Sequence, residues 1–275
     1  MNTFEKLAQI DRRIIYLILF IVVAIPFLFK VQISMKPTSD VVEAYEFIDS
    51  IPEGSAVIIS IDYDASSMPE LQPMLEAILR HLFSRNIRVL LMSQWALGLP
   101  LGQEAIEQVA EEYDKKYGVD YVVLGYRPGL QAVIINMGRD LPATFDNVDY
   151  KNRPLKDMPV MEGIKNYGNI AVIIGLEAGS VGDLWAQFAN SRYGVKLILG
   201  ATAVVAPDLY PYKQAGQVVA ILGGLRAAAD YETLVKHKGA ATYGMASQAF
   251  VHFLIIAFII LGNIGYLASR RKRRS

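Results

Sequence analysis

Cysteine is absent from this 275-residue sequence, and histidine occurs at only three positions. The lack of cysteine excludes disulfide bonds and thiolate chemistry. The three histidines, His81, His237 and His252, are far apart in the sequence. Local sequence therefore assembles neither a histidine metal site nor a Ser/His/Asp catalytic set.

The sequence also lacks a complete glycine-rich phosphate loop. Residues 98–102 carry two glycines without the required spacing and with a proline between them. Residues 175–179 follow a predicted strand and precede a predicted helix, where an anion site or a tight turn would fit, and the incomplete motif favours the turn. We therefore expect no bound nucleotide cofactor.

Charge is balanced over the chain but not along it. Residues 31–244 contain 18 basic and 25 acidic residues, a net charge of −7, whereas residues 270–274 are all basic. An acidic central region argues against nucleic acid as its partner.

Hydrophobic residues make up 53% of the chain and concentrate in two runs. The runs predict transmembrane helices at residues 14–33 and 245–267, the first of them short and interrupted by Pro26. A cleaved signal peptide is the alternative for the first run, but residues 31–36 contain no Ala-x-Ala type site. We expect an uncleaved anchor, with the lipid bilayer as a partner.

The basic cluster at 270–274 favours the cytoplasmic side of a cell membrane, so two spans place both termini in the cytoplasm and the main domain outside it. The expected segments are a cytoplasmic amino terminus at 1–13, a first span at 14–33, a connector with one short helix at 34–54, an extracytoplasmic α/β domain at 55–238, a connector at 239–244, a second span at 245–267, and a basic cytoplasmic tail at 268–275.

Strand and helix patterns alternate between the two runs. The expected strands are 56–61, 87–92, 121–124, 170–174 and 195–199. The expected helices are 68–85, 102–117, 181–193 and 218–235, while 131–137 fits either a strand or a short helix. This alternation predicts an α/β fold with a doubly wound, mostly parallel, Rossmann-like sheet.

Polar residues at the ends of the first two predicted strands form the candidate site. Asp62, Asp64 and Ser66 offer oxygen ligands that could hold Mg²⁺ or Ca²⁺, and Ser93 would stand beside them. The alternative is structural, because Asp and Ser in such a loop form turns and cap the following helix.

The Asp62-x-Asp64 pattern, with Ser93 after the next strand, resembles the haloacid-dehalogenase phosphatases. This resemblance implies that Asp62 is a nucleophile, Asp64 a general acid and Ser93 a phosphate contact. The loop before the first helix is shorter than in that family, and Glu177 has no acidic neighbour after its strand. Residues 64–68 also resemble the Asp-x-Ser-x-Ser metal site of von Willebrand factor A domains, with Met68 in the last position.

Residues 206–212 hold two prolines and two tyrosines, which favours either a rigid partner surface or a packed loop. Together with residues 62–71 and 223–228, this stretch resembles a group of uncharacterised two-span bacterial membrane proteins with a Rossmann-like middle domain. That resemblance implies architecture and no catalytic residue.

Three hypotheses for function follow from these observations. The first is a non-enzymatic, membrane-anchored binding or assembly scaffold that forms a homo-oligomer or binds a membrane protein. The second is a metal-dependent phosphoester hydrolase that uses Asp62 and Asp64. The third is an extracytoplasmic ligand sensor that acts through a partner.

Overall fold

The computed structural model describes residues 11–33 and 35–272. Two compact units divide the chain: Met35–Ala241 forms the larger one, and the segments on either side of it form the other. Each unit is described by itself below.

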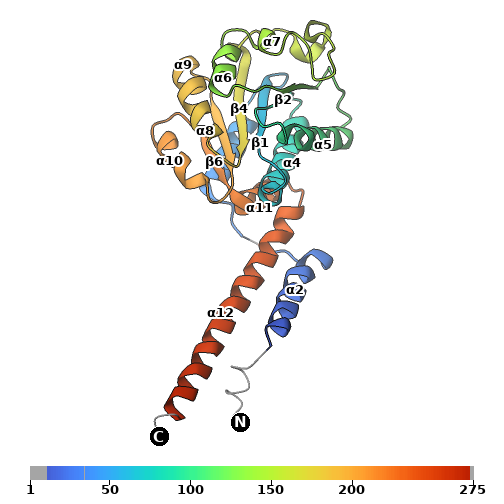
Figure 1. Ribbon diagram of the computed structural model, residues 1–275. Coiled ribbons are helices and arrows are strands. Elements are labelled where there is room, and N and C mark those ends of the chain that lie inside the picture. Colours follow the sequence, from blue (N-terminus) through green and yellow to red (C-terminus); the bar gives the residue numbers. More distant parts are fainter. Residues whose placement is uncertain (1–10, 34, 273–275) are drawn as a thin grey trace. The chain divides into compact units, whose positions relative to one another are not determined.

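The larger unit contains one β-sheet with helices around it (Figure 1). Its six strands are parallel and have the order β3-β2-β1-β4-β5-β6. They are β1 (Ala56–Asp62), β2 (Arg88–Ser93), β3 (Tyr121–Tyr126), β4 (Ile170–Glu177), β5 (Leu197–Ala201) and β6 (Ala220–Gly223). The chain adds β2 and β3 on one side of β1 and then returns to add β4 on its other side. This confirms the predicted α/β, Rossmann-like sheet and places its topological switch point between β1 and β4.

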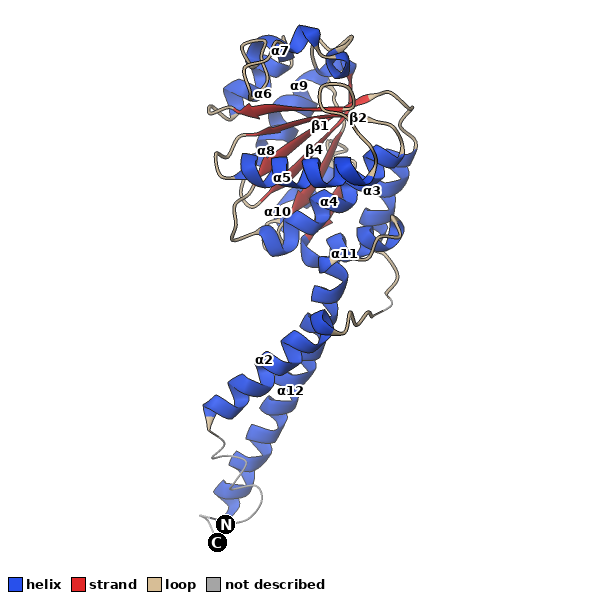
Figure 2. Ribbon diagram, turned by 90° about the vertical axis from the view of Figure 1, so that its right-hand side faces the viewer, coloured by secondary structure: helices blue, strands red, loops and turns tan. Residues whose placement is uncertain are grey.

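Helices cover both faces of the sheet (Figure 2). They are α3 (Ser39–Asp49), α4 (Met68–Ser84), α5 (Gly98–Glu112), α6 (Gln131–Met137), α7 (Leu141–Thr144), α8 (Val181–Leu184), the π-helical stretch η4 (Trp185–Asn190), α9 (Ser191–Tyr193), α10 (Ala206–Gln214) and α11 (Gly224–Leu234). Short 3-10 turns occur at Leu155–Asp157, Pro159–Met161 and Tyr167–Asn169. Because the sheet is covered on both faces, its strands are mostly apolar, and every residue of β1 is buried.

The carboxyl-terminal part of the domain differs from the prediction. The prediction of a helix at 218–235 is wrong in its first part, where Ala220–Gly223 forms β6 before α11 begins. Gly224 makes this junction with a φ of +64°, and a Cβ there would lie 2.8 Å from the Cβ of Ala203. A residue other than glycine would be strained in that conformation. The Gly-Gly pair thus marks a strand-to-helix turn rather than a helix interior.

Three other segments have a structure that differs from the prediction or that the prediction left open. The proline-rich stretch 206–212 belongs to helix α10, with Pro207 in its first turn, where a proline is tolerated. The ambiguous segment 131–137 is helix α6. Helix α3 was expected in a connector, but Val41, Ala44 and Ile48 are fully buried within the larger unit.

Among the described residues, one helix is long and apolar enough to cross a membrane. It lies at Ala240–Leu267, within α12 (Ala240–Lys272), and contains the predicted second span. The predicted first span at 14–33 is shorter in the structure, because α2 (Arg12–Leu28) has 17 residues, about 26 Å of helix. Lys30, with a φ of +49°, turns the chain out of the helix. The expectation of one qualifying span at each end is therefore not supported.

The two helices of the smaller unit contact each other. The Ser247 hydroxyl of α12 donates a hydrogen bond of 2.9 Å to the carbonyl oxygen of Val23 in α2. Pro26 is the buried residue of α2, whereas most of its large apolar side chains are exposed.

Candidate functional site

Two acidic residues meet at the switch point of the sheet. Asp62 ends β1 and Glu177 ends β4, and the two are register partners in adjacent parallel strands. Their side chains therefore leave the sheet on the same face. Asp62 is 0% exposed and Glu177 is 1% exposed. The structure thus buries a pair of carboxyl groups where open α/β sheets commonly bind ligands.

Asp62 is held by donors from its own strand and from the segment after β2. The Ser60 hydroxyl donates to its Oδ2 at 2.6 Å, and the backbone N–H of Gln94 donates to its Oδ1 at 2.8 Å. Burial raises the pKa of Asp62 to about 6, and these hydrogen bonds, with the nearby Trp185 indole, oppose that rise. Asp62 therefore changes charge near neutral pH.

Glu177 faces the start of the helix that follows its strand. Its Oε2 accepts a hydrogen bond from the backbone N–H of Gly182, but its Oε1 is buried without a partner among the described residues. Burial, followed by the negative charges of Asp62 and Asp183, raises the pKa of Glu177 to about 9, against the effect of the Gly182 hydrogen bond. Between these two pKa values the pair carries one negative charge.

Glycines make room for this arrangement. A Cβ on Gly182 would collide with the Glu177 carboxyl group. A Cβ on Gly175 would lie 3.4 Å from Cδ1 of Trp185, so the indole packs over β4 at the residue that pairs with Ser60. Trp185 is fully buried, and its indole N–H lies close enough to Asp62 to lower the pKa of that carboxyl group without forming a hydrogen bond of normal geometry. The indole therefore closes the face on which the two acids lie.

Gln94 adds another polar group beside the pair. Its backbone N–H is bonded to Asp62, and its side chain is 4% exposed with neither amide atom hydrogen-bonded to a described residue. Unpaired buried polar atoms are costly, at about 1–3 kcal/mol each. Their concentration around Glu177, Trp185 and Gln94 distinguishes this region from the apolar core.

The other predicted site residues do not join this pair. Asp64 accepts hydrogen bonds from the backbone N–H and the hydroxyl of Ser66, at 2.9 and 2.6 Å, which lower the pKa of Asp64. Asp64 and Ser66 thus form a turn at the surface. The Ser93 hydroxyl lies 2.5 Å from the carbonyl oxygens of both Ile61 and Trp95, so its hydrogen bonds are made to the backbone. Within the described residues, no group of three or more His, Asp or Glu side chains could hold a metal ion.

Sequence reasoning missed the partners of Asp62. It ended the fourth strand at 174 and treated Glu177 as isolated, whereas β4 continues to Glu177. Once the strand is extended, parallel pairing with β1 brings Glu177 beside Asp62. Gln94 and Trp185 carried no local signal, because their positions depend on packing between distant segments.

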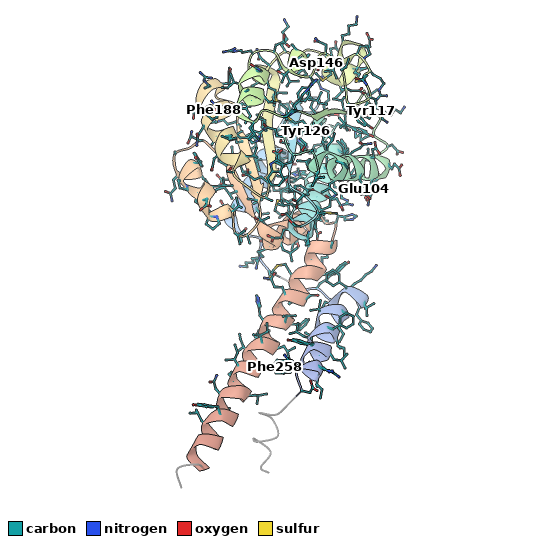
Figure 3. The ribbon with its side chains drawn as sticks, viewed as in Figure 1. Glu104, Tyr117, Tyr126, Asp146, Phe188 and Phe258 are labelled. Atoms are coloured by element: carbon teal, nitrogen blue, oxygen red, sulfur yellow. The ribbon has the colours of Figure 1, made fainter. Side chains whose placement is uncertain are left out.

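Exposed apolar side chains follow three other strands at the same edge of the sheet. Leu97 is 69% exposed after β2, Val204 is 83% exposed after β5, and Tyr126 and Leu130 are exposed at and after the end of β3. Tyr126 is labelled in Figure 3. We call Leu97, Tyr126, Leu130 and Val204 the apolar rim. They flank the strands that carry the buried acids.

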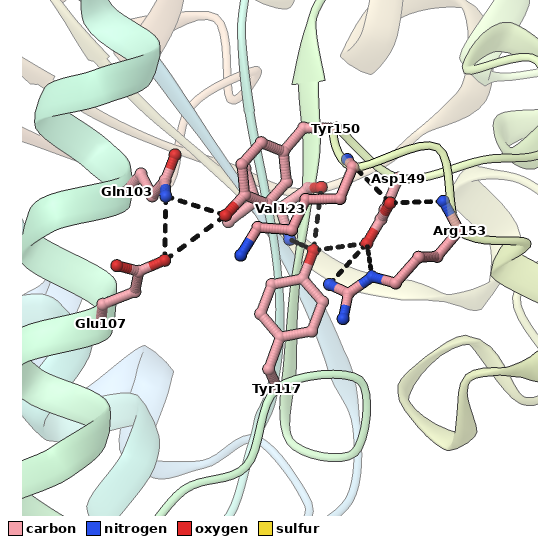
Figure 4. Close-up of polar contacts among 8 residues, drawn as sticks. Gln103, Glu107, Tyr117, Val123, Asp149, Tyr150 and Arg153 are labelled. Carbon is pink, nitrogen blue, oxygen red and sulfur yellow. Dashed lines mark hydrogen bonds and ion pairs between the residues drawn. The ribbon is translucent and has the colours of Figure 1, made fainter.

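A second polar cluster lies beside β3 (Figure 4). Asp149 accepts hydrogen bonds of 2.8 Å from the Tyr117 hydroxyl and from Nε of Arg153, and the Arg153 guanidinium lies 4.2 Å from the centre of the Tyr117 ring. The Tyr150 backbone N–H donates to the carbonyl oxygen of Val123 in β3. Because its charges are paired internally, this cluster has a structural role: it holds residues 149–153 along the sheet edge.

Comparisons with protein-family models, with curated proteins and with solved structures found no match.

Proposed function

We propose that this chain is a membrane-anchored, non-enzymatic binding and assembly protein whose α/β domain associates with a second copy through the apolar rim. The observation that carries the proposal is the exposure of Leu97 and Val204 on opposite sides of the switch point. The rim residues share the carboxyl-terminal edge of the sheet, and apolar side chains that form one exposed surface favour a protein interface over a purely solvated surface.

Membrane attachment supports association between copies. The apolar stretch Ala240–Leu267 follows directly on the last part of the α/β domain. Confining two copies to one bilayer raises their effective concentration, so a rim of modest area is sufficient for pairing. Another membrane protein is the alternative partner.

The proposed topology places the α/β domain outside the cytoplasm and both termini inside. Its support is the basic cluster at 270–274 directly after α12 and the exposed apolar surface of α2, which includes Phe20 and Phe27. Such a surface is stable in lipid and costly in water. Because α2 has only 17 residues, it would cross the membrane where the bilayer thins locally or where flanking side chains extend to the head groups.

The geometry gives less support to the phosphoester hydrolase. A nucleophile must reach its substrate, but Asp62 is fully buried. The Ser93 hydroxyl, which the phosphatase resemblance assigns to phosphate, contacts the carbonyl oxygen of Ile61 instead.

Assembly is tested by measuring the mass of the full chain in neutral-lipid nanodiscs or mild detergent. We expect an oligomer for the natural sequence and a monomer for a Leu97→Ser, Val204→Ser double variant. Val119→Ser is the matched control, because Val119 is 46% exposed but precedes β3 at the opposite edge of the sheet. A monomeric natural protein, or an oligomer unchanged by the double variant, would reject rim-mediated assembly.

Topology is tested with single cysteines, since the chain has none. We expect a membrane-impermeant maleimide to label Ser66→Cys in intact cells and to label Ser275→Cys only after permeabilisation. Ser60→Cys is the buried control and should react only after unfolding, because Ser60 is 0% exposed. Labelling of Ser66→Cys only in lysed cells would reverse the proposed orientation.

A further inference from the structure

A large pocket is formed by the crossover that connects β3 to β4. Its volume is about 730 Å³, and its lining comes from residues 139 and 140, from Pro142 of α7 and from residues between 146 and 166. Pockets of roughly 300–1,000 Å³ commonly hold small molecules. The buried side chains of Leu155, Met161 and Ile164 contribute to its wall. The pocket can therefore take a ligand with an apolar portion.

Three basic residues line this pocket without a partner. The side chains of Arg139, Lys156 and Lys165 form no hydrogen bond or ion pair with any described residue. All three are exposed, so their charges are available to a ligand.

The two acidic residues of the pocket are already engaged. Asp140 caps α7 by accepting a hydrogen bond of 2.9 Å from the backbone N–H of Ala143. Asp146 forms an ion pair with Arg127, with 2.5 Å between Nη2 and Oδ2. Apart from the Asp146–Arg127 pair, the lining carries three positive charges and the one negative charge of Asp140, in a region of the chain whose net charge is −7 over residues 31–244. Locally unpaired positive charge in an acidic domain favours an anionic ligand.

We propose that this pocket binds a small amphipathic anion, with a carboxylate or phosphate group at Arg139, Lys156 and Lys165 and an apolar body against Leu155 and Ile164. Lysine and arginine bind such oxyanions through charge-assisted hydrogen bonds, and the apolar wall adds affinity by removing carbon surface from water. None of the four residues of the apolar rim lines this pocket, and binding here does not require the proposed assembly.

The first experiment uses the full chain in nanodiscs of neutral phosphatidylcholine, with binding measured by calorimetry. The probes are butyl phosphate, inorganic phosphate, hexanoate, butanol and butylammonium. We expect butyl phosphate to bind more tightly than inorganic phosphate, by up to about fourfold for each buried methylene. Butanol and butylammonium should bind at least tenfold more weakly, and hexanoate shows whether a carboxylate replaces the phosphate.

The same measurement separates a free ligand from a lipid head group. If the pocket takes an anionic lipid, nanodiscs that contain phosphatidylglycerol should weaken the binding of butyl phosphate by competition. If it takes a free molecule, the affinity should be the same in both kinds of nanodisc apart from a general salt-dependent repulsion.

The second experiment changes the charges. We expect a Lys156→Gln, Lys165→Gln double variant to lose at least tenfold in affinity for butyl phosphate, while Lys196→Gln, an exposed lysine outside the pocket, keeps it. Unchanged tryptophan fluorescence would show that the double variant is folded. Three results would overturn the proposal. They are binding of butylammonium as tight as that of butyl phosphate, no binding of any anionic probe at 10 mM, which is roughly the millimolar limit of weak affinity, and equal affinity of the double variant and the control.

Discussion

Replacing Glu177 with glutamine tests the electrostatics of the buried pair directly. Burial and the charge of Asp62 raise the pKa of Glu177 from 4.5 to about 9. The native state therefore holds a proton that the unfolded chain releases at lower pH. Because the native state binds more protons between those two values, stability should fall as pH rises from 4.5 to 9.

The magnitude follows from the size of this window. Each pH unit within it corresponds to about 1.4 kcal/mol of stability. Between about pH 5 and pH 8, the free energy of unfolding of the natural protein should fall by up to about 4 kcal/mol, and the Glu177→Gln variant should not show this loss. Glutamine has nearly the same shape, and its Oε1 can still accept the hydrogen bond from Gly182 N–H.

The assay is urea unfolding of the full chain in mild detergent, followed by tryptophan fluorescence. The chain has two tryptophans, and Trp185 is fully buried over the acid pair, so its emission reports on the site. The control is Glu104→Gln, an exposed residue of α5 whose replacement should change stability by less than about 0.5 kcal/mol. If the natural protein and Glu177→Gln had the same pH dependence, our account of the buried pair would be refuted.

Three further predictions concern other parts of the domain. Gly182→Ala places a Cβ against the Glu177 carboxyl group and should lower the midpoint of urea unfolding by the equivalent of at least about 2 kcal/mol; an unchanged midpoint would contradict this packing. Burial lowers the pKa of His81 to about 4, so stability should be lost as pH falls from 6.5 toward 4, and His81→Gln should keep up to about 3 kcal/mol of it in acid denaturation curves. Phosphate esters with Mg²⁺ should be hydrolysed no faster by the natural protein than by Asp62→Asn, and a faster rate would reverse our ranking of binding over hydrolysis.

The candidate site was only half predictable from the sequence. Asp62 stands at the end of an obvious apolar strand, so its place at the edge of the sheet followed from local pattern. The roles of Asp64 and Ser66 as turn formers were among the alternatives for the same reason. The pairing with Glu177 depends on which strands are neighbours, and that is decided by contacts between residues more than a hundred positions apart.

Local composition by itself determined the alternation of strands and helices, the parallel sheet and the carboxyl-terminal apolar helix, because each depends on propensity and hydrophobic pattern within a short segment. Tertiary structure decided the rest. It placed β6 where a helix was predicted, and it enclosed Asp62 and Glu177 beneath Trp185. These outcomes depend on which surfaces meet and exclude water, and no short segment of sequence contains that information.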